Sequence, residues 1–154
     1  MKKEILHCLV ETYKHVQLVQ NHLSKFTKDL IDRGLKHDTS KFEEPELSIF
    51  AANTHKLGLT EYGTDEYRAL LREVQPAIDH HYAKNRHHPE NHLNGINDMN
   101  LVDLIEMISD WKAATERNKN GNIKKSIEVN KQRYGIDSQL AKILENTVKD
   151  YFPE

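Results

Sequence analysis

Apolar side chains recur at helical spacing along most of the 154-residue chain. In residues 3–24, for example, one face carries Ile5, Leu9, Val16, Val19 and Leu23. Only six glycines and four prolines interrupt the pattern, and alternating β-branched runs are scarce. We therefore predict an all-α fold. Because no repeat or linker divides the sequence, we predict a single domain over residues 1–154.

The boundaries of the expected helices follow from capping residues. Ser24 and Thr27 are expected to break the first helix, with Thr27 as the N-cap of the next one. Thr64 is expected to open a helix that Pro76 bends, and Asn100 and Asp137 are expected to cap two later ones. The expected helices cover residues 3–24, 27–36, 45–57, 64–84, 101–117, 123–134 and 138–151, with loops at 58–64 and 85–99.

Composition argues against a membrane span and against nucleic acid as a partner. The formal net charge is −2, so the chain has no global basic field. No apolar run approaches the roughly 20 residues of a spanning helix. Glu4 and Glu11 interrupt any secretory signal pattern, and the single cysteine, Cys8, cannot form an internal disulfide. We expect a cytoplasmic protein.

Histidine is the unusual residue, since the chain has ten and five of them fall between residues 80 and 92. Such clusters indicate metal binding, proton chemistry or a pH switch. Outside this group, His37 lies beside Asp38 at the expected end of a helix, where both side chains can project past the last turn. If the two preceding helices form a hairpin around Phe26, His15 lies level with this pair. The sequence thus predicts a meeting of His15, His37 and Asp38.

The expected helix 101–117 adds carboxylates. We expect one face to carry Leu101, Leu104, Ile105, Ile108 and Trp111, with Trp111 in the core. The other face carries Asp103, Glu106 and Asp110 together with apolar Met107. A carboxylate on a central helix needs a cation or hydrogen-bond donors, and a metal ion would supply the cation.

Four of these residues resemble the ordered signature of the HD-domain superfamily of metal-dependent phosphohydrolases: His15, then His37-Asp38, then Asp110 in "LIEMISDWKAA". The stretch "HDTSK" is similar to the HD-x-x-K form, in which the lysine helps to bind phosphate, and this maps to Lys41. The chain also resembles uncharacterised HD-like proteins of bacteria and phages in "HDTSKF", "HYAKNRHHPE" and "DLIEMISDW".

The resemblance implies an HD-domain-like helical bundle that holds a divalent metal through His15, His37, Asp38 and Asp110. Mixed imidazole and carboxylate ligands suit Mn, Fe, Co, Ni or Zn, as one ion or two. Such an ion would activate water against a nucleotide or a related small phosphoester, with Asp38 and Lys41 as catalytic residues.

The histidine-rich loop leaves alternatives open. His81, His87 and His88 stand where some HD branches ligate a second metal. They can instead bind phosphate and donate a proton, together with Arg86, or the loop can be a surface feature. Glu46 either orients a water or ligand or lies on the surface.

Three functions remain in competition at this level. The first is a phosphohydrolase, and the second is a di-iron oxygenase on the same fold, which the additional histidines would permit. The third is a non-catalytic module that binds a metal or a nucleotide. With no second domain to recognise a substrate, specificity is expected to come from loops 58–64 and 85–99 or from a homo-oligomeric partner.

Overall fold

The computed structural model describes residues 2–60, 64–117 and 120–153, and these contain six α-helices, three short 3₁₀ helices and no strand. The all-α prediction is confirmed. By contacts between Cα atoms, the chain divides into two compact units, Met1–Lys36 and His37–Glu154. The elements are α1 (Lys3–Lys36), η1 (Thr39–Phe42), α2 (Glu46–Leu59), α3 (Asp65–Lys84), η2 (Pro89–Asn91), η3 (Gly95–Asp98), α4 (Leu101–Glu116), α5 (Ile123–Tyr134) and α6 (Ser138–Tyr151).

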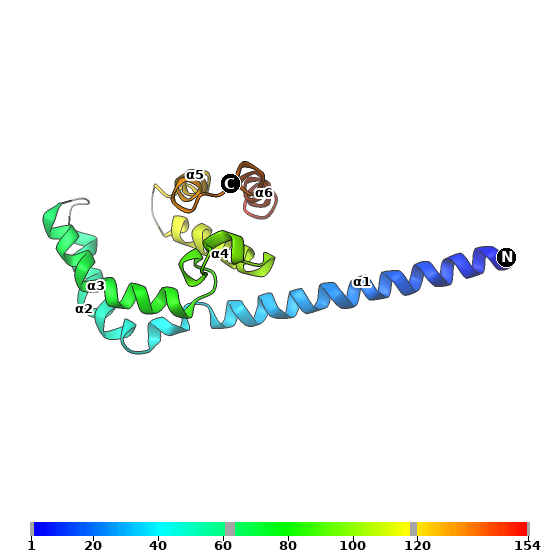
Figure 1. Ribbon diagram of the computed structural model, residues 1–154, viewed down its shortest axis with the longest axis horizontal. Coiled ribbons are helices and arrows are strands. Elements are labelled where there is room, and N and C mark those ends of the chain that lie inside the picture. The colour runs from blue at the N-terminus through cyan, green and yellow to red at the C-terminus, as the bar shows by residue number, and fades with distance from the viewer. Residues whose placement is uncertain (1, 61–63, 118–119, 154) are drawn as a thin grey trace. The chain divides into compact units, whose positions relative to one another are not determined.

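The first unit is one continuous helix, α1 (Figure 1). The predicted break at Ser24 and Thr27 is therefore wrong, as is the hairpin around Phe26. The hydroxyl of Ser24 donates to the carbonyl of Gln20 at 2.9 Å, and that of Thr27 donates to the carbonyl of Leu23 at 3.1 Å. Both hydroxyls thus bond within the helix, and no glycine or proline precedes Gly34 to end it.

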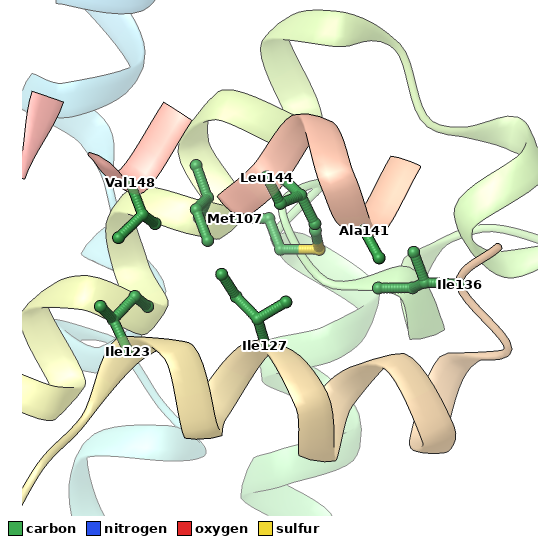
Figure 2. Close-up of a cluster of buried hydrophobic side chains, with 8 residues drawn as sticks. Met107, Ile123, Ile127, Ile136, Ala141, Leu144 and Val148 are labelled. Atoms are coloured by element: carbon green, nitrogen blue, oxygen red, sulfur yellow. The ribbon is translucent and has the colours of Figure 1, made fainter. Parts of the chain in front are cut away.

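The second unit has its hydrophobic core between α4, α5 and α6. Figure 2 shows Met107, Ile127 and Leu144 pointing toward one another from these three helices. Buried side chains around them complete the cluster, which consists of Met107, Ile108, Ile123, Ile127, Ile136, Ala141, Leu144 and Val148. Trp111 packs against this cluster and is partly buried, as predicted. Burial of this apolar surface fixes α4, and hence the carboxylates it carries.

Helix α4 is central, as expected, but its buried face differs from the prediction. Met107 and Asp103 are fully buried, whereas Leu101 and Ile105 are 71% and 43% exposed. The buried face differs from the expected one because the Asp103 side chain points into the protein. It forms a capping box with Asn100 and accepts two hydrogen bonds from Arg86, at 2.9 and 3.2 Å. The Arg86 pair ties the histidine-rich loop to α4.

Most of the other predicted boundaries hold. Thr64 caps α3 through Tyr67 N, and Asp137 caps α6 through Leu140 N. Helix α3 runs continuously across Pro76. Helix α2 continues to Leu59, so part of the expected loop 58–64 is helical, while residues 61–63 lie outside the described residues. The expected loop 85–99 contains η2 and η3.

Among the residues that the structure describes, no helix is both long enough and apolar enough to cross a membrane.

Candidate metal centre

The candidate site lies entirely in the second unit, where three segments converge. His37 and Asp38 directly follow α1, and Asp38 precedes η1 in a left-handed conformation with φ of 56°. This conformation is uncommon for residues other than glycine, although aspartate tolerates it better than most. The Asp38 side chain makes no capping hydrogen bond. Helix α4 contributes Glu106 and Asp110, one turn apart.

Histidines from α3 and the following loop complete the site. Three sets of side chains each offer ligand atoms that lie within 4.8 Å of one another. They are Asp38, His81, His87 and His88; His37, Asp38 and Asp110; and His37, His87 and Glu106. Asp38 belongs to the first two sets, and its two carboxylate oxygens face different neighbours. We refer to these seven residues together as the His/Asp cluster.

Distances within the His/Asp cluster place Asp38 at its centre. Its Oδ1 is 3.3 Å from His81 Nε2 and 3.5 Å from His87 Nε2. Its Oδ2 is 3.6 Å from His37 Nε2 and 2.6 Å from Lys41 Nζ. One oxygen therefore faces two imidazole nitrogens, and the other faces His37 and Lys41. A carboxylate with its two oxygens directed at different neighbours could contact two cations.

Two buried atoms of the cluster lack hydrogen bonds. Within the part of the chain that the structure describes, neither Asp38 Oδ1 nor His87 Nε2 makes one. Unsatisfied buried polar atoms are rare in folded proteins and call for an explanation. Because both atoms are metal ligands by chemistry and face each other, a cation between them fits the site.

The electrostatics of the cluster favour a cation beside Asp38 and Asp110. The carboxylates of Asp110 and Glu106 raise the pKa of His37 to about 10. Burial acts to raise the pKa of Asp38, but the neighbouring His81 and Lys41 outweigh it and lower that pKa. For Asp110, burial is likewise outweighed by His37, and the pKa is lowered. The carboxylates are therefore ionised, and His37 carries a proton that a metal ion would replace.

His88 has the opposite character. Burial lowers its pKa to about 3, and the neighbouring His87 and His81 contribute to the decrease. Its imidazole is therefore neutral at pH 7 and offers a lone pair. Its Nε2 lies 2.9 Å from that of His81, within hydrogen-bonding distance, and both histidines belong to the same ligand set.

Glu46 contacts the cluster through the Nδ1 atom of His81. It is completely buried, and its two oxygens lie 2.8 Å from His80 Nδ1 and 2.9 Å from His81 Nδ1. The alternative that Glu46 lies on the surface is wrong. A carboxylate that binds Nδ1–H of His81 fixes the tautomer with a lone pair on Nε2, the nitrogen that faces Asp38.

The structure brings together most of the predicted site residues. His37, Asp38, Asp110, His81, His87 and His88 all lie in the cluster, and Lys41 contacts Asp38. His15 is exposed within α1 and belongs to none of the three ligand sets, and the predicted hairpin that was to deliver it does not form. Sequence reasoning did not assign Glu106 as a ligand, although its place one turn before Asp110 was the available signal.

A recess of about 350 Å³ adjoins the cluster, and its lining includes His88 and Asp110. The other residues of the lining come from the end of α3, from α4, from the turn before α5 and from one face of α5. They are Tyr82, Trp111, Ala114, Thr115, Gly121, Ser126, Asn130, Arg133 and Tyr134. The rings of Trp111 and Tyr134 are nearly parallel, at 9°, with centroids 6.3 Å apart.

Polar contacts hold the walls of this recess. Glu90 of η2 accepts hydrogen bonds from Arg133 Nη2 at 2.8 Å and from the Tyr134 hydroxyl at 3.1 Å, which joins the histidine-rich loop to α5. Gly121 is required by space, because a Cβ there would lie 1.8 Å from the carbonyl oxygen of Thr115.

Comparison with known families places the chain in a family of unknown function, DUF5662, whose model matches residues 4–150. The chain belongs to this family. No curated protein and no solved structure matches it.

We predict that Glu46→Gln weakens metal binding about 10- to 100-fold while the protein stays folded, because the amide keeps the shape but loses the charge that orients His81. Competition with a chromophoric chelator measures the affinity, and circular dichroism checks the fold. Glu43→Gln serves as the control, because Glu43 is exposed and lies three residues earlier, and it should leave the metal affinity unchanged. Equal affinities for both variants would show that Glu46 does not orient a ligand.

Proposed function

We propose that the protein is a metal-dependent phosphohydrolase that acts on a nucleotide or a related small phosphoester. The observation that carries the proposal is Asp38, a half-buried carboxylate shared by two ligand sets, with a buried oxygen that makes no hydrogen bond to the described residues. The order of His37-Asp38 and Asp110 along the chain, which resembles the HD-domain superfamily, supports the same chemistry.

His37, Asp38 and Asp110 would hold a first divalent ion, and Asp38 with His81, His87 and His88 would hold a second. A metal bound there would lower the pKa of a water molecule and polarise a phosphoryl oxygen. The protein supplies ionised carboxylates and a neutral His88 imidazole, which are the protonation states that such ligands need.

Lys41 is the residue best placed to bind the phosphoryl group. Its ammonium lies 2.6 Å from Asp38 Oδ2, and its side chain is 44% exposed. A metal ion bound to Asp38 would take over the compensation of its charge, and the exposed Lys41 ammonium would then be free to contact an arriving phosphate. Arg86 is a poorer candidate because its guanidinium is committed to the fully buried Asp103.

The recess beside His88 and Asp110 would hold the organic part of the substrate. It offers the aromatic surfaces of Trp111 and Tyr134 together with the polar side chains of Ser126 and Asn130. Aromatic faces with a few hydrogen-bonding groups are suited to a planar ring that carries its own donors and acceptors, such as a nucleobase.

We predict that protein loaded with Mn²⁺, Co²⁺ or Zn²⁺ releases phosphate or nucleoside from a panel of nucleoside mono-, di- and triphosphates, cyclic nucleotides and simple phosphoesters. Asp38→Asn should lower kcat/KM more than about a hundredfold, because it removes a shared ligand charge. Lys41→Ala should act mainly on KM, with exposed Lys84→Ala as its control. No hydrolysis of any panel member by metal-loaded protein would contradict the proposal.

Trp111 is the only tryptophan, so its fluorescence reports on the recess. We predict that adenosine or guanosine, which lack phosphate, changes the emission saturably, because a base stacked in the recess alters the indole environment. Asn130→Leu should weaken this response about tenfold or more. Gln132→Leu, an exposed amide on the same helix, should not. Equal responses in both variants would place the nucleoside elsewhere.

The two ligand sets that share Asp38 also favour a second candidate, a di-iron oxygenase. Iron-loaded protein would then consume oxygen in the presence of substrate. Metal-dependent release of phosphate without oxygen uptake would decide for the hydrolase.

A further inference from the structure

The apolar side chains of α1 follow a seven-residue repeat. Leu9, Val16, Leu23 and Leu30 are spaced seven apart, which corresponds to one core position of a coiled coil. The second core position, four residues before each, is taken by Ile5, Thr12, Val19 and Phe26. Seven of these eight residues are apolar, Thr12 being the exception. We call this set of eight the seam.

The seam is exposed to solvent. The exposed fractions of its large apolar side chains lie between 40%, at Val19, and 59%, at Leu23, except that Leu30 is half-buried. The face opposite the seam carries Lys14, Asn21 and Lys28 at the same seven-residue interval. A long helix gains most of its stability in water from packing its apolar face, so α1 requires a partner along this seam.

We propose that the partner is α1 of a second copy of this chain, and that the two helices form a two-stranded coiled coil. A repeat of core residues sustained over nearly four heptads is the pattern that specifies such a structure. The positions that flank the seam are Leu6, Cys8, Tyr13, His15, Gln20, His22, Thr27 and Asp29. Only Asp29 among them carries a fixed charge, so they offer no charge pattern that would select a different chain.

The size of the seam is sufficient for association. The 34 residues of α1 extend about 51 Å at 1.5 Å per residue. Seven apolar seam residues from each of two helices, with flanking Leu6 and Tyr13, would bury on the order of 1,000 Å², which is near the lower limit for a specific interface. The proposal involves the first unit alone and does not depend on the proposed hydrolase activity.

Sedimentation of the full-length chain tests the proposal, because the chain mass is 18.0 kDa and the predicted species has twice that mass. Leu23→Glu places a charge in the seam and should weaken the dimer about a hundredfold or more. Leu18→Glu is a matched control, since Leu18 is 58% exposed on the same helix but lies off the seam. A wild-type chain that remains monomeric at about 100 μM would overturn the proposal, as would equal dissociation by both variants.

A second measurement covers the case in which Leu23→Glu unfolds α1 rather than separating the copies. Cys8 is the only cysteine, is exposed and flanks the seam, so a spin label attached there needs no engineered residue. Pulsed dipolar spectroscopy on the labelled wild-type protein should give one narrow distance. A short distance identifies parallel helices, and a long one identifies antiparallel helices. Absence of any dipolar signal between labels would contradict a pair of α1 helices.

Discussion

The half-buried carboxylate of Asp38 is the group on which the rest of the site depends. It is surrounded by His37, His81 and His87, and it keeps its negative charge because His81 and Lys41 lower its pKa. A charge removed from water in this way requires compensation. Lys41 compensates one oxygen, while the other makes no hydrogen bond to the described residues. This imbalance is the physical reason for placing a metal ion at the cluster.

The remainder of the second unit holds this cluster in position. The packing of Met107 and Ile108 in the core fixes α4, and with it the carboxylates of Glu106 and Asp110. The histidine-rich loop is attached at two points, by Arg86 to Asp103 and by Glu90 to α5. Because both attachments are charge-assisted hydrogen bonds, they fix orientation as well as distance. The same Glu90 contacts shape the recess, so the candidate metal centre and the place proposed for substrate share one scaffold.

The sequence predicts the individual helices of this protein better than it predicts how these helices pack against one another. Caps such as Asn100 and Asp137 are local signals, and the structure confirms them. The hairpin in residues 3–36 failed because Ser24 can bond to a carbonyl of its own helix as well as it can cap another. The sequence left the burial of Glu46 undecided and did not indicate the lining of the recess, since burial and the meeting of α4 with α5 are properties of tertiary packing. The cluster itself could be anticipated from residue types, but not the central position of Asp38.

The presence of a metal at the His/Asp cluster is best tested by mass spectrometry of the metal content, on protein purified without chelators. We expect one or two equivalents of a transition metal in the wild-type protein and their loss in Asp38→Asn. We expect the metal to be retained in Asp79→Asn, which changes an exposed carboxylate on α3. A wild-type protein that contains no metal and takes none up on reloading, and that is indistinguishable from a folded Asp38→Asn, would show that the cluster is not a metal centre.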